Sequence, residues 1–351
     1  MNAPQPYFKI LYNNKNITED ISACLRSITY VDNTAGEADE LSIEVDDVDG
    51  RWKGAWFPAK GAKLTAEIGM QGGAVLQCGT FTIDEFDASG PPDIFVIKAL
   101  AAGTTKAVRT KNTYSHDNKS LRQIVQTVAQ NHGFEVLGDV PSVQIGYVLQ
   151  NKETDLSFLN RLSNDYGCTF NLRDNKLVFT NSEQLESASG VLIIKKADVS
   201  AYAFNDKSVG TFAGADVKHY SQKNNEVVTG SANDDDFDGD DVDTIRVSAE
   251  NSQQAELKAR AALNKANSRE RTASFTTSGN TLLLAGNNIS AQDFGSFDGL
   301  YHIETSTHTI TKADGYKTDV SVKMGGTAKK ITSSSKPFTK KAAAGGDDSF
   351  N

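Results

Sequence analysis

The stretch Leu76–Ala102, LQCGTFTIDEFDASGPPDIFVIKALAA, predicts a β-hairpin around which the neighbouring strands can be arranged. Polar and apolar residues alternate from Thr80 to Asp84, which is the period of a half-buried strand. The run Ser89-Gly90-Pro91-Pro92 then predicts a turn, because proline has no amide hydrogen to offer a sheet. Residues Ile94 to Leu100 are nearly all apolar, so we expect a second strand that is covered on both faces.

Two adjacent acids in this hairpin, Asp84 and Glu85, raise the hypothesis of a catalytic pair of carboxylates. Neighbouring residues on a strand point to opposite faces of the sheet, which argues against two carboxyl groups that act on one substrate. We therefore expect Asp84 to lie with Thr82 on the polar face of the strand. There it could line a channel, contact a neighbouring chain or simply face solvent.

The composition indicates several small β-rich units. The chain has 351 residues, of which 38% are hydrophobic, a low share for one large core. The formal net charge is −9 and the basic residues form no cluster, which argues against binding of nucleic acid. The sequence contains no run of about 18 apolar residues and no signal-peptide pattern, so we expect synthesis in the cytoplasm without membrane insertion.

Short strands are predicted before the hairpin as well. They span residues 7–12, 24–30, 40–46 and 62–70. The loop 46–60 carries Trp52, Trp56 and Phe57, which we expect to anchor it by packing. Short strands with turns between them are typical of a β-barrel or a β-sandwich.

A different pattern follows Gly103 and predicts a small α/β unit. Residues 120–132, SLRQIVQTVAQNH, have apolar residues at helical spacing, a capping box from Ser120 to Gln123, and Gly133 as the stop. A second helix is expected over residues 155–166. Strands are expected at residues 145–149, 169–172 and 177–180.

Strand patterns resume at Val191 and are interrupted by an acidic run and a third helix. The strands are expected at residues 191–196, 201–204, 214–220, 272–277, 288–290, 300–309 and 316–323. The helix 251–266 begins at Asn251 and has a face made mostly of alanine, which would let it lie close against a sheet or another chain. The tail 325–351 is rich in Ser, Lys, Ala and Gly, so we expect it to be disordered unless a partner orders it.

The sequence predicts no cofactor, no metal and no catalytic site. Cys24, Cys78 and Cys168 are far apart and lack CxxC spacing, so buried free thiols are expected. A calcium loop in the acidic run NDDDFDGDDVD, residues 233–243, would need glutamate at its twelfth position, which is isoleucine, so a solvated loop is expected. The nearby histidines 302 and 308 lack a third ligand and are expected to be structural or exposed.

Several motifs follow one another along almost the entire chain. They are Gly79–Glu85 with Ser89–Pro92, Ser120–Phe134, Glu153–Gly167, Ala255–Asn267, Gly279-Asn280, Ala285-Gly286, Asp298–Tyr301, His308 and Gly315-Tyr316. In their order and spacing they resemble the phage late control protein D family, the baseplate hub of contractile phage tails. They are also similar to the N-terminal part of the VgrG proteins of type VI secretion and to the hubs of phage-tail-like bacteriocins.

The resemblance implies a mainly β fold with an α+β insertion, in which two hub-type β-barrel domains flank or enclose a small α/β domain. The expected segments are a first barrel at 1–104, the α/β domain at 105–185, a second barrel at 186–325 and a flexible tail at 326–351. The second barrel would carry the acidic loop 233–243 and the helix 251–267. Three chains would form a ring of six barrels that joins a hexameric tail tube to a trimeric spike.

The implied role is structural. The implied partners are two further copies of the chain, the tail tube protein, the central spike protein, baseplate wedge proteins and, as a further candidate, the tape measure protein. The chain would be made in the bacterial cytoplasm and assembled into a virion or a tail-like particle. The residues expected to serve assembly or structure are Gly79, Phe81, Asp84, Gly90, Pro91, Pro92, Asp155, Leu156, Phe158, Leu159, Gly286, Gly299, Tyr301, His308, Gly315 and Tyr316.

Two alternatives from other classes stay open. A peptidoglycan- or carbohydrate-cleaving tail enzyme would need a convergent pair of carboxylates, one with a raised pKa. An adhesin for host glycans would need an exposed aromatic platform, whereas the two tryptophans lie in one loop that we expect to be packed.

Overall fold

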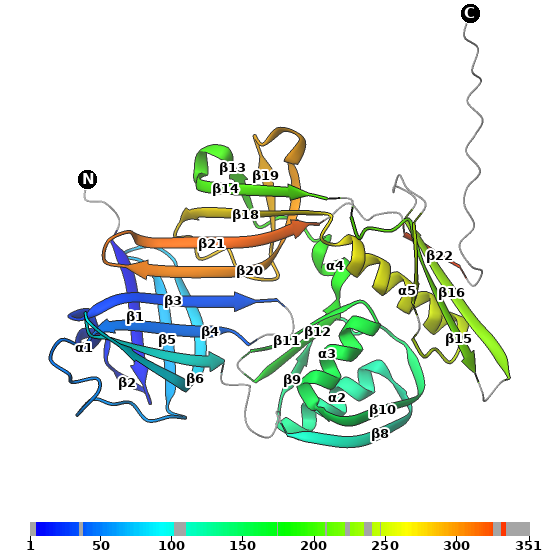
Figure 1. Ribbon diagram of the computed structural model, residues 1–351, viewed down its shortest axis with the longest axis horizontal. Coiled ribbons are helices and arrows are strands. Elements are labelled where there is room, and N and C mark those ends of the chain that lie inside the picture. Colours follow the sequence, from blue (N-terminus) through cyan, green and yellow to red (C-terminus); the bar gives the residue numbers. More distant parts are fainter. Residues whose placement is uncertain are drawn as a thin grey trace, which may run out of the picture. The chain divides into compact units, whose positions relative to one another are not determined.

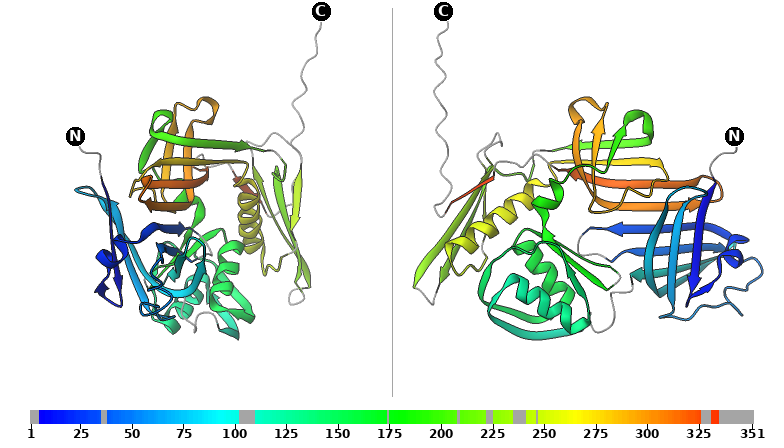
Figure 2. Two further views of the ribbon diagram at one scale, coloured as in Figure 1. Left: turned by 60° about the vertical axis from the view of Figure 1, so that its left-hand side comes forward. Right: turned by 180° about the vertical axis from the view of Figure 1, so that it is seen from behind.

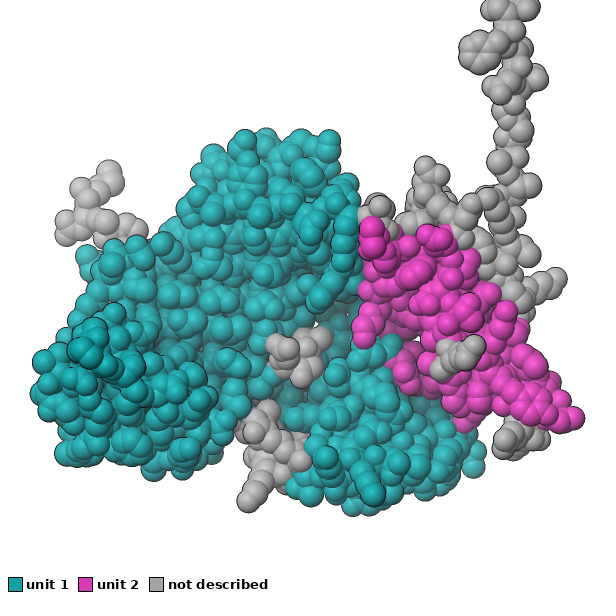
Figure 3. All heavy atoms as spheres, in the orientation of Figure 1, with its two compact units in different colours: residues 1–164, 168–207, 268–327 teal, residues 165–167, 208–267, 328–351 magenta. Residues whose placement is uncertain are grey.

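The computed structural model (Figure 1) describes residues 5–34, 38–101, 110–173, 175–207, 209–221, 225–234, 241–245, 247–325 and 331–334. Strands predominate in all views (Figure 2), which confirms the mainly β fold class. The chain divides into two compact units (Figure 3). Unit 1 comprises residues 1–164, 168–207 and 268–327, and unit 2 comprises residues 165–167, 208–267 and 328–351.

The N-terminal strands of unit 1 form where alternation predicts them. They are β1 (Pro6–Tyr12), β2 (Lys15–Asn16), β3 (Leu25–Asn33), β4 (Glu40–Asp46), β5 (Lys63–Met70), β6 (Val75–Ser89) and β7 (Ile94–Ala101), with helix α1 (Thr18–Ser22) before β3. They pair antiparallel in the order β3-β4-β7-β6-β5-β1-β2. The predicted hairpin is therefore the β6–β7 pair in the middle of this group.

The C-terminal strands of unit 1 extend the same sheet. They are β13 (Leu192–Lys195), β14 (Val199–Asp206), β18 (Arg271–Ser278), β19 (Asn288–Gln292), β20 (Gly299–Thr311) and β21 (Gly315–Met324), with 3-10 helices η1 (Lys196–Asp198) and η2 (Gly295–Phe297). The order β14-β18-β21-β20 continues into β3, because β20 pairs antiparallel with β3 (Figure 1). The result is a 13-stranded sheet whose path, among the described strands, does not close on itself.

Both hydrophobic cores of unit 1 pack on the same face of this sheet. In β21, Tyr316 belongs to the N-terminal core, whereas Val320 and Val322 belong to the C-terminal core. These residues are an even number of positions apart, so their side chains leave the strand on one side. On β3, β4, β20 and β21 the opposite face carries mostly polar side chains, whereas β7 adds the half-buried Ile94, Val96 and Leu100 to it.

The β7 strand corrects one expectation. Phe95, Ile97, Ala99 and Ala101 are buried, but the alternate residues are partly or fully exposed. The N-terminal core covers only one face of β7. On the other face, Lys98 Nζ lies 2.6 Å from Asp87 Oδ2. The apolar run therefore does not mark a strand that this chain covers on both sides.

The loop after β4 is only partly anchored as predicted. Trp52 is buried and stacks on Phe95, with ring centroids 6.3 Å apart. Trp56 and Phe57 are 40% and 55% exposed. The prediction that all three aromatic residues pack inside the fold is therefore wrong. Phe57 still contacts the rings of Phe86 and Phe95, with centroids 5.0 Å and 5.8 Å away.

The α/β part of unit 1 has the predicted helices. Its elements are β8 (Lys111–Ser120), α2 (Leu121–His132), β9 (Glu135–Leu137), β10 (Gln144–Thr154), α3 (Asp155–Asp165), β11 (Cys168–Arg173), β12 (Lys176–Asn181) and α4 (Ser182–Glu186). Ser120 and Gln123 form the predicted capping box, and Gly133 ends α2 in the left-handed conformation, with φ of 69°. The boundaries of the four predicted segments stay predictions, and the first boundary, at residue 104, lies outside the described residues.

Unit 2 is a four-stranded sheet with a helix along one face (Figure 2). Its elements are β15 (Gly214–Ser221), β16 (Glu226–Asp234), β17 (Val242–Ile245), α5 (Ser252–Asn267) and β22 (Ile331–Ser334). Ala255, Ala259 and Leu263 pack on the sheet, as the alanine face predicts. A Cβ on Gly230 would stand 2.3 Å from the backbone nitrogen of Glu256, so only glycine permits this close approach.

Two expectations for unit 2 need correction. The expected flexible tail contains β22, which pairs antiparallel with β16, so four of its residues are ordered within the chain. The acidic run is not entirely a solvated loop, because Asp234 ends β16, is buried and accepts a hydrogen bond from Asn267 at 3.2 Å. Residues 235–240 lie outside the described residues. They include most of the positions that the calcium-loop hypothesis concerned.

Candidate assembly surface

Three predicted residues meet at the pairing of β3 with β20, which we call the seam. Tyr30 of β3 contacts Phe81 edge to face and stacks on His308, with ring centroids 5.9 Å apart in both pairs. Tyr316 packs against His308, also with centroids 5.9 Å apart. All four side chains are buried, so the seam holds these residues inside the fold and not on a surface.

His308 is the centre of a buried polar network at the seam. Its Nδ1 lies 2.8 Å from the hydroxyl of Tyr316, and its Nε2 lies 3.0 Å from the carbonyl oxygen of Leu283. Burial raises the pKa of Tyr316 above the ordinary value of a tyrosine. The network fills the space between the two apolar cores with paired polar groups, which is how buried polar atoms are tolerated.

The segment from Gly279 to Asn287, between β18 and β19, is bound across this seam. A Cβ on Gly279 would stand 2.0 Å from the ring of Tyr316, so the backbone lies directly against that ring. The N–H of Ala285 donates to Oδ2 of the buried Asp32 at 3.1 Å. Gly286 has φ of 88°, a conformation that favours glycine. The predicted residue Gly286 therefore allows the backbone of this segment to turn as it does.

The predicted residues of β6 lie at its irregular positions. Gly79 has φ of 97° next to a register shift between β5 and β6. Asp84 lies in a second register shift, between Ile83 and Glu85 of β6. Both acids are exposed in the single chain, so the expected alternation fails at this bulge. The role of Asp84 stays a prediction. Glu85 is 3.6 Å from Lys98, which gives it a structural partner.

The turn after β6 contains the remaining predicted residues of the hairpin. Gly90, Pro91 and Pro92 are exposed between β6 and β7, and both prolines follow cis peptide bonds. This confirms the turn.

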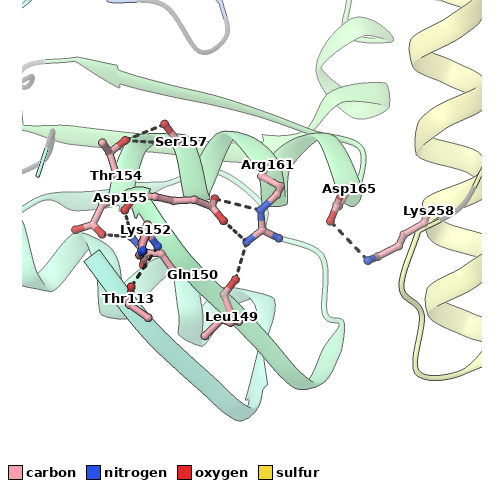
Figure 4. A network of polar contacts seen from close by, with 11 residues as sticks. Thr113, Leu149, Gln150, Lys152, Thr154, Asp155, Ser157, Arg161, Asp165 and Lys258 are labelled. Carbon is pink, nitrogen blue, oxygen red and sulfur yellow. Dashed lines mark hydrogen bonds and ion pairs between the residues drawn. The ribbon is translucent and has the colours of Figure 1, made fainter. Parts of the chain in front are cut away.

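Asp155 is buried at the start of α3 and organises a polar network (Figure 4). Its carboxylate oxygens lie 2.6 Å from His132 Nε2 and 2.7 Å from Gln150 Nε2. Nearby, Arg161 contacts Glu153 at 3.0 Å and donates to the carbonyl oxygen of Leu149 at 2.9 Å (Figure 4). A carboxylate at a helix N-terminus is favoured by the helix dipole. The network fixes α3 to β10.

The other predicted residues also have structural places. Phe158 and Leu159 form the buried face of α3, and Leu156 is half-buried. Tyr301 is buried and donates from its hydroxyl to the carbonyl oxygen of Phe297 at 2.8 Å, and burial raises its pKa. Gly315 makes the turn between β20 and β21 with φ of 74°, and Gly299 begins β20.

The polar face of the 13-stranded sheet is the surface that fits assembly best. On β20 it presents Thr305, Thr307 and Thr309, and their partners on β21 are Ser321, Asp319 and Lys317. On β3 the partners of the same three threonines are Asn33, Val31 and Thr29. The polar face thus crosses the seam, with Val31 as an apolar residue within it. No motif pointed to this face, although the alternation in ETSTHTIT, residues 304–311, is a signal for it.

The histidines and acids of the described residues form no candidate metal site. No group of three or more His, Cys, Asp and Glu side chains among them could hold a metal ion. His302 is buried next to Asn288, and desolvation lowers its pKa to about 4. His116 is buried against Phe158, which lowers its pKa as well. No described helix is long and apolar enough to cross a membrane.

Similarity to known proteins agrees with this architecture. The 43 kDa tail protein of prophage MuSo2 from Shewanella oneidensis matches with a TM-score of 0.70 at 15% identity, over 90% of this chain and 98% of that chain. A component of the type VI secretion system of Escherichia coli matches with a TM-score of 0.54 at 13% identity, over 85% and 73%. This chain therefore shares its fold with these two proteins.

The family follows from the sequence match. A family model described as phage tail baseplate hub (GPD) matches residues 102–314. A probable baseplate hub protein of Escherichia phage 186 is 31% identical over 219 residues, which are 61% of this chain and 56% of that protein. The chain belongs to the phage tail baseplate hub (GPD) family, as the motifs predict. It spans about half the length of this relative.

Proposed function

We propose that this protein is the structural hub of a contractile tail or a tail-like particle and acts as a homotrimer. In this proposal the two strand groups on either side of the seam are the two barrel-type domains of each chain. Three chains would then present six similar domains to a hexameric tube and three copies to a trimeric spike. Wedge proteins and the tape measure protein are further proposed partners.

The observation that carries the proposal is the mainly polar face that runs from β21 and β20 across the seam to β3. Both cores pack behind it, and short hydroxyl side chains such as Thr305, Thr307 and Thr309 cover it. A surface of this kind suits the wall of a water-filled channel. The family membership supports the same reading.

We also propose that the chain has no enzymatic activity. The alternative, a peptidoglycan- or carbohydrate-cleaving enzyme, needs two carboxylates across a cleft. Asp84 and Glu85 instead lie exposed on a bulge, and Glu85 has Lys98 as its partner. The proposed role is therefore mechanical.

Native mass spectrometry of the full chain, alone and with the spike protein of the same particle, tests the proposal. The expected result is a mass of three chains in at least one of these conditions, together with particles that carry the chain in the baseplate. A stable monomer in both conditions would overturn the trimer. Release of sugars or peptides from purified cell wall would overturn the mechanical role.

A further inference from the structure

A polar hollow in unit 1 is lined by residues within or next to five strands, β3, β14, β18, β20 and β21. Its volume is about 490 Å³, which lies in the range of ligand pockets in proteins. The hydroxyl groups of Thr272, Thr305 and Ser321 come from three neighbouring strands, β18, β20 and β21. The remaining lining residues are Asn33, Thr34, Asn205, Lys207, Arg269 and Glu304.

The register of the sheet builds this hollow. Thr305 is paired both with Ser321 of β21 and with Asn33 of β3, and its hydroxyl donates to Oδ1 of Asn33 at 3.1 Å. Asn205 of β14 is paired with Thr272 of β18. The hydroxyl and amide groups therefore project from a rigid sheet, on the same polar face that crosses the seam.

The charges around the hollow favour an anion. Arg269 and Lys207 are the two cations of the lining, and Glu304 is its single acid. The guanidinium of Arg269 lies 3.8 Å from the carboxylate of Glu304, so these two charges offset each other. Lys207 is exposed and has no ion pair with another described residue. One positive charge is thus left over in a chain whose formal net charge is −9.

The lining also limits the kind of anion. It contains no aromatic ring on which a base or a sugar could stack. It contains neither glycine nor a helix N-terminus, the usual cradle of a phosphate. Hydroxyl and amide side chains, by contrast, can bond to the N–H and C=O groups of an extended peptide.

We propose that this hollow binds a short extended polypeptide segment that carries a carboxylate side chain. The carboxylate lies between Lys207 and Arg269, and the peptide groups bond to the hydroxyl and amide side chains of the floor. The site is independent of the trimer proposal, because every residue of the lining comes from one chain and from unit 1.

The test is a titration of the full-length protein with two blocked tetrapeptides, acetyl-Gly-Asp-Ser-Gly-amide and acetyl-Gly-Asn-Ser-Gly-amide, followed by NMR line broadening of the peptide. The aspartate peptide is expected to bind at least about threefold more tightly, and the difference should shrink at high salt. Lys207→Gln should weaken binding of the aspartate peptide roughly two- to fivefold, the range of an exposed charge contact. Glu304→Gln should strengthen it, because an opposing charge is removed.

Lys15→Gln is the matched control, since Lys15 is an exposed lysine of β2, outside the lining. Its binding curve should equal that of the unmodified protein. Equal affinity for both peptides, or an unchanged affinity in Lys207→Gln with an unchanged thermal midpoint, would overturn the proposal. Inorganic phosphate that binds as tightly as the aspartate peptide, with the same loss in Lys207→Gln, would also overturn it in favour of a simple anion site.

Discussion

The predicted motif residues of this chain serve its backbone and its interior. Gly79, Gly286 and Gly315 adopt positive φ values that favour glycine, and His308 and Tyr316 fill the seam. Such places accept few other residue types, so they give a sequence its recognisable motifs. A solvated surface of threonine and serine accepts many substitutions. The motifs therefore identify the fold, whereas the surface proposed for assembly carries little of the resemblance.

His302 should make the stability of unit 1 sensitive to acid. Its pKa is lowered from 6.5 to about 4 by burial, so the unfolded chain binds a proton at a higher pH than the folded chain does. The stability is full above pH 6.5 and is lost as the pH falls from 6.5 toward 4, by roughly 3 kcal/mol in total. Urea unfolding at several pH values measures this loss.

The variant His302→Gln separates this effect from general acid unfolding. It should be less stable at pH 7, because the contact with Asn288 is altered, but its stability should change less between pH 6.5 and 4. A smaller slope in the same direction should remain, since His116 also has a lowered pKa. The control His219→Gln, in unit 2, should keep the slope of the unmodified protein. An equal slope in His302→Gln would contradict this assignment.

Asp84→Asn tests the role of the exposed acid on β6. Its side chain lies on a bulge away from the hollow, so the variant should fold with stability within about 0.5 kcal/mol of the unmodified protein. It should show no loss of hydrolysis of cell wall, and any effect should fall on assembly of the proposed trimer or on its proposed contact with a tail tube. A hydrolytic activity that is present in the unmodified chain and absent from this variant would refute the structural role.

At the scale of elements, the sequence predicts single helices and strands well. Local signals suffice for α2, where Ser120 and Gln123 form the capping box, and for β4, where buried residues alternate. They do not suffice for β22, which forms a strand because it pairs with the edge of β16 in unit 2. The bulge at Asp84 and the half-exposed β7 likewise depend on neighbouring strands and not on local preference.

Gly230→Ala should loosen the packing of α5 on β16. The added Cβ would stand 2.3 Å and 2.4 Å from backbone atoms of Glu256 and Ala255, which cannot move aside as a flexible side chain could. The helix must shift, at a cost of about 3 kcal/mol, the upper part of the range for overpacked cores. Denaturant unfolding followed by circular dichroism measures the loss.

Gly73→Ala is the control for this substitution. Its Cβ would meet only Met70 at 3.5 Å, an ordinary contact, so the change in stability should be about 0.5 kcal/mol or less. Equal stabilities of the two variants would show that α5 does not lie against Gly230 in solution. A large loss in Gly230→Ala with native-like unit 1 would locate the effect in unit 2.

At the scale of the whole molecule, the chain joins its two strand groups through one pairing. Residues 27–33 of β3 pair with residues 305–311 of β20, a contact between segments that lie far apart in the sequence. No local pattern predicts such a partner, because any amphipathic strand of similar length offers the same backbone groups. The resemblance implied two barrel domains, but the continuous sheet between the strand groups became visible only in the structure.

The seam should make the 13-stranded sheet unfold as one unit. His308→Leu removes one hydrogen-bond partner of the buried Tyr316 hydroxyl and one of the Leu283 carbonyl, which keeps its bond from the Ser306 hydroxyl, at a cost of about 2 kcal/mol. These groups lie between the two cores. The loss of stability should therefore lower protection from hydrogen exchange equally in β4 and β7 on one side and in β18 and β21 on the other. Hydrogen exchange at increasing denaturant measures both sides, with Lys15→Gln as the unperturbed reference. Faster exchange on the β18–β21 side alone would show that the two strand groups are separate folding units. The shared sheet could then not transmit mechanical force between them, as the proposed mechanical role would require.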